Sequence, residues 1–234
     1  MAPRRKSAVV LLSGGMDSAT CLWWAKRRGY RLWALSVDYG QRHARELRSA
    51  RALARAAGAR LFELRLSLPW LQVSSLVDRE RKLPDVPVKR IGKTGIPSTY
   101  VPGRNTLFMA LGVSLADAVG ADAVAVGANV LDFSGYPDCR PKFYRAFESV
   151  AKSGTRGGAE GRPLKIETPL LNLDKAAIAR MARDLGVPLA RTWSCYRGGR
   201  RPCGICDACK LRAKGFLEAG FPDPASGSAP RRGR

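Results

Sequence analysis

No apolar run in this chain of 234 residues approaches the roughly 20 residues that a membrane-spanning helix needs. The basic residues 1–6 precede an apolar stretch, 8–12, that is too short for the core of a signal peptide. No internal repeat is visible either. These absences exclude a protein embedded in a membrane, and we expect a cytoplasmic one.

Acidic residues are also scarce, because 19 Asp and Glu face 41 Lys and Arg, which gives a formal net charge of +22. Clustered cations would indicate a nucleic-acid partner, since neutralising phosphates favours binding. The arginines are instead dispersed, as at Arg27, Arg42 and Arg55, and scattered charge is typical of solvated helix faces. We therefore expect no nucleic-acid partner, although the positive field would attract small anionic substrates.

Two of the six cysteines stand alone, and the other four lie within fifteen residues: Cys195, Cys203, Cys206 and Cys209. Disulfides are rare in cytosolic proteins, so this spacing indicates a metal site. Four thiolates complete a tetrahedral Zn²⁺ shell and leave no open coordination position, which predicts structural zinc. An iron–sulfur cluster is the alternative that the same ligands leave open.

Strand patterns and helix patterns alternate along most of the chain. Strands are predicted at 7–12, 31–37, 59–64, 123–127 and 166–170, and helices at 17–28, 42–57, 106–119, 142–152 and 174–185. This alternation favours an α/β fold with parallel strands and right-handed crossovers. The segment 68–102 contains five prolines and predicts an irregular excursion over the mouth of the active site.

The domain organisation follows from these patterns. We expect a basic N-terminal tail at 1–6, an α/β domain at 7–190 and a small helical four-cysteine zinc module at 191–221. The remaining residues, 222–234, are Pro, Gly, Ser and Arg with almost nothing apolar, which predicts a disordered tail.

The first predicted strand enters the first helix through Ser-Gly-Gly-Met-Asp-Ser at 13–18. Glycines let the backbone approach an anion closely, and a helix N-terminus offers free N–H groups and partial positive charge. Ser13 and Ser18 add hydroxyl donors, while Asp17 either holds Mg²⁺ or orders the loop. The predicted nucleotide site comprises Leu12, Ser13, Gly14, Gly15, Met16, Asp17, Ser18, Ala19, Thr20, Cys21 and Leu22.

This loop resembles that of the N-type ATP pyrophosphatases, which cleave ATP between its α- and β-phosphates. The resemblance implies that residues 7–190 form an α/β domain of that type with a Rossmann-like parallel sheet. Further segments extend the similarity: DYGQRHARE (38–46), PSTYVPGRN (97–105), DFSGYPDCR (132–140), ETPL (167–170) and TWSCY (192–196). Together with the later cysteines they resemble the 7-cyano-7-deazaguanine synthase family over residues 8–224. The chain departs from that pattern at Phe133, where a tyrosine is common, and in a slightly shorter first cysteine loop.

The resemblance implies a ligase that adenylates 7-carboxy-7-deazaguanine, aminates it to the amide, then adenylates the amide oxygen to give the nitrile. It implies ATP and Mg²⁺, one Zn²⁺ per chain and a homodimer. Because no glutaminase module is visible, free ammonia is the expected nitrogen source. The shared loop leaves open a tRNA-modifying pyrophosphatase such as a thiolase, although no appended RNA-binding domain is visible. A nucleotide-binding module without activity is a third alternative.

The candidate site residues follow from these motifs. Catalytic roles are expected of Ser13, Asp17, Ser18 and Arg104, and we expect Arg104 to contact phosphate or the substrate carboxylate because arginine pairs bidentately with oxyanions. The residues expected to bind the substrate are polar and lie in two loops: Arg104, Asn105, Asp132, Ser134, Tyr136, Asp138 and Arg140.

Four other residues also have expected roles. His43 is the only histidine and could be a general base, but we predict a packing or supporting residue early in a helix. Cys139 is predicted to be a structural thiol rather than a nucleophile, and Cys21 to pack in the core. Trp193 is a candidate for the wall of the substrate pocket.

Overall fold

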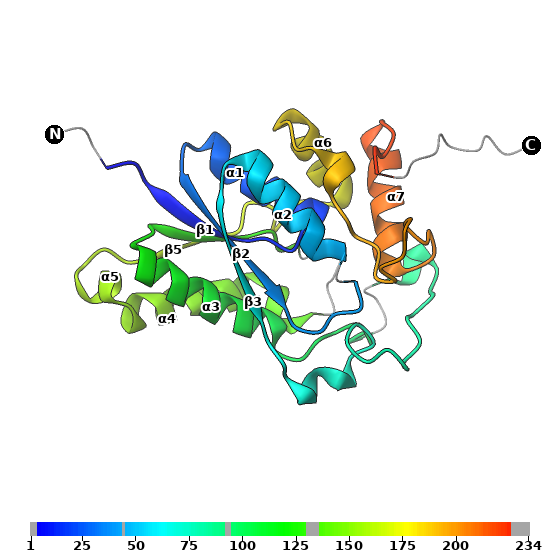
Figure 1. Ribbon diagram of the computed structural model, residues 1–234, viewed down its shortest axis with the longest axis horizontal. Helices are drawn as coiled ribbons and strands as arrows, with labels where there is room; N and C mark the ends of the chain where they lie inside the picture. The colour runs from blue at the N-terminus through cyan, green and yellow to red at the C-terminus, as the bar shows by residue number, and fades with distance from the viewer. Residues whose placement is uncertain (1–3, 44, 92–94, 130–135, 226–234) are drawn as a thin grey trace, which may run out of the picture.

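The computed structural model describes residues 4–43, 45–91, 95–129 and 136–225, and its centre is a parallel sheet of five strands (Figure 1). The strands are β1 (Ser7–Leu11), β2 (Arg31–Asp38), β3 (Arg60–Arg65), β4 (Ala123–Val126) and β5 (Lys165–Glu167). Their order is β3-β2-β1-β4-β5, and every neighbouring pair is parallel. The predicted Rossmann-like sheet is confirmed.

Helices cover both faces of the sheet (Figure 1). They are α1 (Met16–Arg27), α2 (Arg45–Ala57), α3 (Arg104–Val119), α4 (Pro141–Gly154), α5 (Arg156–Ala159), α6 (Lys175–Asp184) and α7 (Asp207–Ala219). Short 3-10 turns are η1 (Pro69–Val73), η2 (Val88–Arg90), η3 (Pro137–Cys139) and η4 (Leu189–Arg191). One core joins α1, α2, α6 and α7, and a second core joins α3 and α4 on the other face.

Strand β1 belongs to both cores. Val10 packs with the helices of the first core and Val9 with those of the second, and neither side chain is exposed. Successive side chains in a strand point to opposite faces, so a central parallel strand reads as a continuous apolar run. This explains why residues 7–12 were recognisable from the sequence.

The order of the strands places the site. From β1 the chain first builds towards β3 on one side, then crosses to β4 on the other. Ligands of such sheets bind where the order reverses, at the carboxyl ends of the strands, which here are the ends of β1 and β4. Gly127 follows β4, and a β-carbon there would lie 2.7 Å from the carbonyl oxygen of Asp17. Only glycine lets β4 end this close to the 13–18 loop.

Two boundaries differ from the sequence-based predictions for identifiable reasons. Helix α2 begins at Arg45, so His43 lies in the preceding turn and its predicted place early in a helix is wrong. The Gln41 side chain holds this turn by accepting from the Tyr39 N–H at 2.8 Å and donating to the Val37 carbonyl at 3.3 Å. Strand β5 ends at Glu167, before Pro169, which has no N–H for a ladder.

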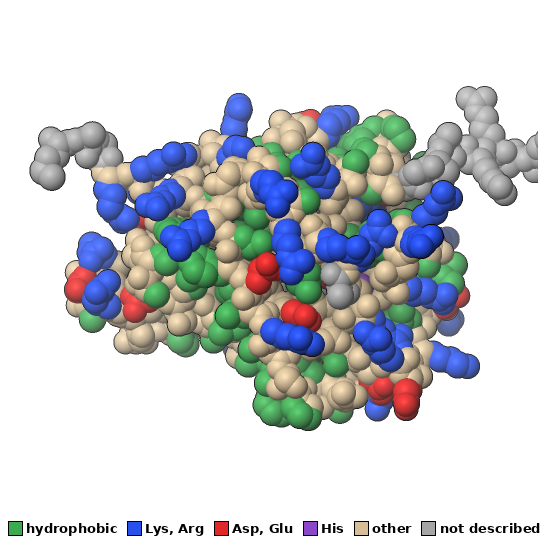
Figure 2. All heavy atoms as spheres, viewed as in Figure 1, with side chains coloured by type: hydrophobic (Ala, Val, Ile, Leu, Met, Phe, Trp, Pro, Cys, Tyr) green, Lys and Arg blue, Asp and Glu red, His purple; other side chains and the backbone are tan. Residues whose placement is uncertain are grey.

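The surface is dominated by cations. Figure 2 shows Lys and Arg side chains spread over one face of the molecule, with few acidic groups between them. This spread fits solvated helix faces better than a single basic tract. Within the described part of the chain, none of the helices is long and apolar enough to cross a membrane.

Candidate active site

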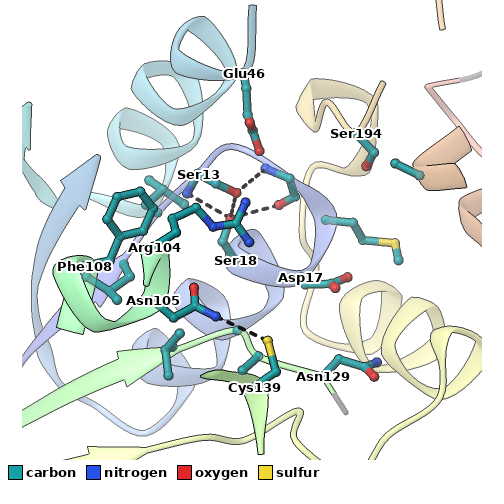
Figure 3. A pocket seen from close by; sticks show the side chains of 18 of the residues that line it. Ser13, Asp17, Ser18, Glu46, Arg104, Asn105, Phe108, Asn129, Cys139 and Ser194 are labelled. Carbon is teal, nitrogen blue, oxygen red and sulfur yellow. Dashed lines mark hydrogen bonds between the residues drawn. The ribbon is translucent and has the colours of Figure 1, made fainter. Parts of the chain in front are cut away.

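A cavity of about 270 Å³ opens at the carboxyl ends of β1, β2 and β4 (Figure 3). Its wall includes the 13–18 loop, the first turns of α3 and α6, and the segment 193–196 that leads into the cysteines. The irregular segment 68–102 contributes Leu76 to the rim. The structure therefore places the predicted phosphate loop in the same cavity as Arg104, Asn105 and Tyr136, three of the residues predicted to bind the substrate.

The phosphate loop is closed by Ser18. The Ser18 hydroxyl oxygen accepts from the N–H groups of Ser13 at 3.2 Å and Gly14 at 3.3 Å, and it lies 3.0 Å from Ser13 Oγ. It also donates to the Gly15 carbonyl at 3.1 Å. These bonds fix the loop beside the start of α1, where the first helical turn leaves N–H groups that can bind an anion.

A lysine that the sequence analysis missed completes this loop. Lys175 Nζ lies 2.8 Å from Asp17 Oδ2, and the two side chains are 11% and 23% exposed. Lys175 is the first residue of α6, directly after Asp174, whose carboxylate caps the helix by accepting from the Ala177 N–H. The pairing supports the loop-ordering role of Asp17. The partners lie 158 residues apart in sequence, so no local pattern indicates the contact.

We expect Lys175→Met to lower the free energy of unfolding by roughly 2 kcal/mol, since it leaves the Asp17 carboxylate without its partner in a partly buried site. Urea unfolding measures this. Lys214→Met is the matched control, because Lys214 Nζ lies 3.7 Å from Glu218 Oε1 and both side chains are half exposed. The control should cost less than about 0.5 kcal/mol. Equal losses would contradict a structural role for the Lys175–Asp17 pair.

Arg104 begins α3 at the cavity wall, and its Nη1 donates to Tyr39 Oη at 3.4 Å. Burial raises the pKa of the Tyr39 phenol although the charge of Arg104 opposes this shift, so Tyr39 stays protonated. Tyr136 also lines the cavity, with its hydroxyl 2.9 Å from Thr99 Oγ1. These side chains combine a fixed cation with aromatic walls.

The other predicted substrate residues lie in different places. Asn105 lines the cavity. The Asp138 carboxylate instead accepts a hydrogen bond from the Asn105 N–H, in the first turn of α3, at 3.1 Å. Arg140 is exposed and is not part of the cavity wall. Asp132 and Ser134 lie outside the described residues.

Cys139 has the environment of a structural thiol. Its sulfur accepts from Asn105 Nδ2 at 3.2 Å, and the side chain is 7% exposed. Burial, reinforced by the charge of Asp138, raises the pKa of the Cys139 thiol to about 11. Since the thiolate is the reactive form, this favours the structural interpretation over a covalent one. Cys21 is fully buried in the first core, as predicted.

The four late cysteines form one cluster. Their sulfur atoms, from Cys195, Cys203, Cys206 and Cys209, all lie within 4.8 Å of one another. Zinc–sulfur bonds of about 2.3 Å place tetrahedral ligands at comparable separations, so the cluster fits Zn²⁺.

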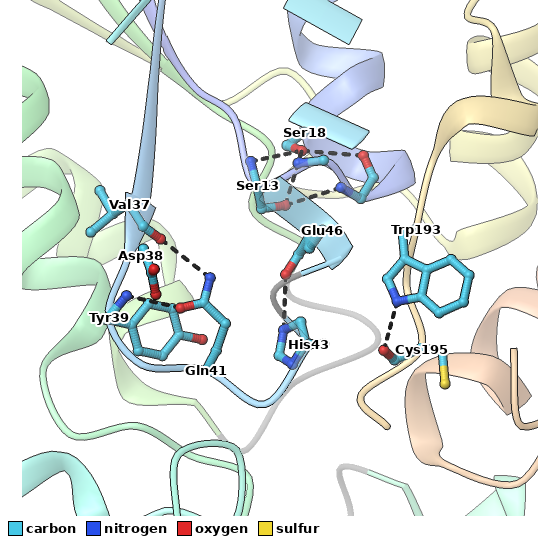
Figure 4. Close-up of polar contacts among 12 residues, drawn as sticks. Ser13, Ser18, Val37, Asp38, Tyr39, Gln41, His43, Glu46, Trp193 and Cys195 are labelled. Carbon is cyan, nitrogen blue, oxygen red and sulfur yellow. Dashed lines mark hydrogen bonds and ion pairs between the residues drawn. The ribbon is translucent and has the colours of Figure 1, made fainter. Parts of the chain in front are cut away.

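The cysteine cluster is attached to the phosphate loop through Trp193, which lines the cavity (Figure 4). The Trp193 N–H donates to the Gly14 carbonyl at 2.9 Å, and its indole Nε1 donates to the Cys195 carbonyl at 2.9 Å. The Arg45 guanidinium lies 4.3 Å from the centre of the indole ring. The fold of the cluster therefore helps to set the position of the loop.

His43 and Glu46 form a second buried pair at the cavity (Figure 4). His43 Nε2 lies 2.8 Å from Glu46 Oε2, and the His43 ring is 5.6 Å from that of Tyr196. Glu46 was not among the predicted site residues. Its spacing of three from His43 was a possible signal, because residues three apart meet once a helical turn forms.

Comparisons with known proteins cover almost the whole chain. The model of the family described as "Queuosine biosynthesis protein QueC" matches residues 7–220. The 7-cyano-7-deazaguanine synthase of Anaeromyxobacter sp. (strain Fw109-5) is 53% identical over 221 residues, covering 94% of this chain and 95% of that protein. The synthase of the same name from Synechococcus sp. (strain RCC307) is 48% identical over 221 residues, with coverages of 94% and 98%.

A solved structure supports the fold independently. The chain resembles a 4-thiouridine synthetase, solved as an RNA complex with bound ATP, with a TM-score of 0.51 and 20% sequence identity. The match covers 92% of this chain and 50% of that one. At this identity the likeness concerns the fold alone.

Proposed function

Since the chain belongs to the QueC family of 7-cyano-7-deazaguanine synthases, we propose that it converts 7-carboxy-7-deazaguanine and ammonia to 7-cyano-7-deazaguanine at the expense of ATP. The observation that carries the proposal is a single cavity that joins a preformed phosphate loop to a cationic and aromatic wall. The phosphate loop suits ATP, and the cationic and aromatic wall suits a flat heterocycle with a carboxylate.

In the first step a substrate carboxylate oxygen attacks the α-phosphorus of ATP, and pyrophosphate leaves. We assign the pyrophosphate to the 13–18 loop, where Ser13, Ser18 and the N–H groups at the start of α1 lie ready for an anion. Mg²⁺ is held largely by substrate phosphates in such sites. Asp17 Oδ2 is paired with Lys175, so Asp17 would order the loop and would help to hold Mg²⁺ only through Oδ1. Residues 12–22 would form the nucleotide site.

The remaining residues would position the acid. Arg104 is assigned to the substrate carboxylate or the α-phosphate, since guanidinium groups bind both oxyanions in a bidentate manner. Tyr136 and the neighbouring aromatic side chains would pack against the heterocycle, and Asn105, which lines the cavity, would contact it. We assign Asp132 and Ser134 to this substrate too. Cys195, Cys203, Cys206 and Cys209 would hold a structural Zn²⁺, which supplies stability rather than reaction chemistry.

Mass spectrometry of a reaction with Mg-ATP, ammonium and 7-carboxy-7-deazaguanine tests the function. We expect the nitrile together with AMP and pyrophosphate, and no nitrile when ammonium is left out. An unchanged acid, with thiolation of added tRNA instead, would replace the proposal with a tRNA-modifying activity. We also propose that the protein is cytoplasmic and forms a homodimer, and sedimentation of the purified protein tests the dimer.

A further inference from the structure

Arg212, on α7, lies in the wall of the cavity with all its hydrogen-bond donors occupied. Its Nε and Nη2 donate to the Asp223 carboxylate at 2.6 and 2.8 Å, and Nη2 also donates to the Leu189 carbonyl at 3.4 Å. Its Nη1 donates to Thr192 Oγ1 at 2.8 Å and to Ser194 Oγ at 3.2 Å. A guanidinium group has five N–H bonds, so none is left for a ligand.

Asp223 holds this arginine in place. The Arg212 and Asp223 side chains are only 8% and 13% exposed, and a guanidinium that meets a carboxylate through two parallel bonds is firmly oriented. Asp223 belongs to the segment 222–234, which the composition predicts to be disordered, yet its carboxylate is part of the cavity's support. Because the two charges cancel, the pair adds no net charge to the cavity. What it adds is a fixed position for Ser194.

The Ser194 hydroxyl is the donor that this arrangement presents to a ligand. Ser194 lines the cavity, its oxygen accepts from Arg212, and no other described residue bonds to its hydroxyl. A hydroxyl that accepts from a cation keeps its own hydrogen for a second partner and donates it more strongly. Thr192 differs, because its hydroxyl donates to the Leu189 carbonyl at 2.7 Å and is not part of the cavity wall.

Ser194 lies on the phosphate side of the cavity. It follows Trp193, whose N–H donates to the Gly14 carbonyl at 2.9 Å. Neighbouring α-carbons are about 3.8 Å apart, so this bond keeps Ser194 beside the phosphate loop. Figure 3 shows Ser194 on the opposite side of the loop from Arg104 and Asn105. Ser194 is therefore placed for the phosphates of ATP rather than for the heterocycle.

The phosphate loop leaves a use for such a donor. A pyrophosphate group carries terminal oxygen atoms in several directions, and the start of α1 faces only one of them. The Ser13 and Ser18 hydroxyls also bond to each other at 3.0 Å, and Lys175 is paired with Asp17 at 2.8 Å. A hydroxyl from the facing wall can reach oxygens that the loop does not, and its bond to a charged oxygen is of the stronger kind.

We propose that Ser194 donates a hydrogen bond to the pyrophosphate part of ATP, with Arg212 as the residue that positions Ser194 and Asp223 as the residue that holds Arg212. This inference rests on the proposed function in taking ATP as the nucleotide. The three side chains make and break no covalent bond. They hold the β- and γ-phosphates while the substrate attacks the α-phosphorus, and Ser194 stabilises the charge of the departing pyrophosphate.

Ser194→Ala removes the donor and little else. We expect the dissociation constants of Mg-ATP and of magnesium pyrophosphate to rise by roughly 10- to 100-fold, the effect of losing a hydrogen bond to a charged group. AMP lacks the β- and γ-phosphates, so its affinity should stay close to wild type. Ser194→Thr keeps the hydroxyl and should restore most of the affinity. Calorimetric titration measures all three ligands, and the content of zinc should not change.

A double variant tests the positioning role. Asp223→Asn keeps the shape of the side chain but weakens its hold on Arg212, so it should raise the dissociation constant of ATP less than Ser194→Ala does. Added to Ser194→Ala it should cause no further rise, because it acts through Ser194. Thr192→Val is the matched control. It removes the other hydroxyl bonded to Nη1, and it should lower the melting temperature and leave the affinity for ATP close to wild type.

Three results would overturn the inference. Unchanged affinities for ATP and pyrophosphate in Ser194→Ala would remove Ser194 from the site. A loss of affinity for AMP as well would show a general disturbance rather than a lost contact with pyrophosphate. A further loss in the double variant would give Asp223 a route that bypasses Ser194. Failure of the wild-type protein to form the nitrile, with the predicted changes in ATP affinity still observed, would remove the proposed function alone.

Discussion

Cys206→Ala is expected to release the proposed zinc ion and to lower the melting temperature by roughly 6–12 °C, which corresponds to a loss of about 3 kcal/mol in a domain of this size. Cys206 is 2% exposed and shares the cluster with three other sulfur ligands. Removing one ligand opens the shell, and the remaining thiolates then repel one another. Metal analysis and thermal unfolding measure the two effects.

Cys21→Ala is the control for this experiment. Cys21 is also fully buried but lies on α1, outside the cluster, so its variant should keep one zinc per chain. A metal content unchanged in Cys206→Ala would contradict the assignment of the ligands. A brown protein that contains iron would replace zinc with an iron–sulfur cluster.

The cysteine variant should also weaken ATP binding, although no cysteine of the cluster belongs to the phosphate loop. Trp193 connects the two through its bonds to Gly14 and Cys195. Arg45 adds a second connection, since its Nη1 donates to the Gly199 carbonyl at 3.0 Å. A protein that loses zinc yet binds ATP normally would show that these contacts do not transmit the change.

The sequence predicted the features that depend on neighbouring residues. The 13–18 loop and the cysteine spacing are local patterns, and both appear in the structure as expected. Strand β1 was equally readable because it is buried on both faces. Such features need no knowledge of which distant segments meet.

The parts that escaped prediction depend on tertiary contacts. Lys175 reaches Asp17 only because α6 packs beside α1. On its other side Lys175 is close to α7, which Gly215 allows, since a β-carbon on Gly215 would lie 2.4 Å from Lys175 Cγ. Asp138 was predicted to bind substrate, but the meeting of η3 with α3 directs its carboxylate to the Asn105 N–H. Neither contact leaves a periodic or spacing signal in the sequence.

Gly14→Ala is expected to lower ATP-dependent activity by roughly 100-fold, the scale of displacing a binding loop by about 1 Å. Gly14 has φ +97°, and a β-carbon there would lie 2.2 Å from the Glu46 carbonyl oxygen and 2.8 Å from the Ala50 N. Both contacts are with the backbone of α2, so no side chain can move aside. The loop and α2 must separate, which disturbs the anion site. Pyrophosphate exchange measures the loss.

Gly58→Ala is the control for Gly14→Ala, because it carries the cost of the left-handed backbone conformation without a steric clash. Gly58 follows α2 with φ +74°, and nothing lies within 4 Å of a β-carbon placed there. Its variant should lose about 1 kcal/mol of stability, from the left-handed conformation alone, and keep its activity. If Gly14→Ala behaved like Gly58→Ala, the close approach of α2 to the loop would not be needed for catalysis. A large loss in Gly14→Ala alone would make that approach the reason why this position requires glycine.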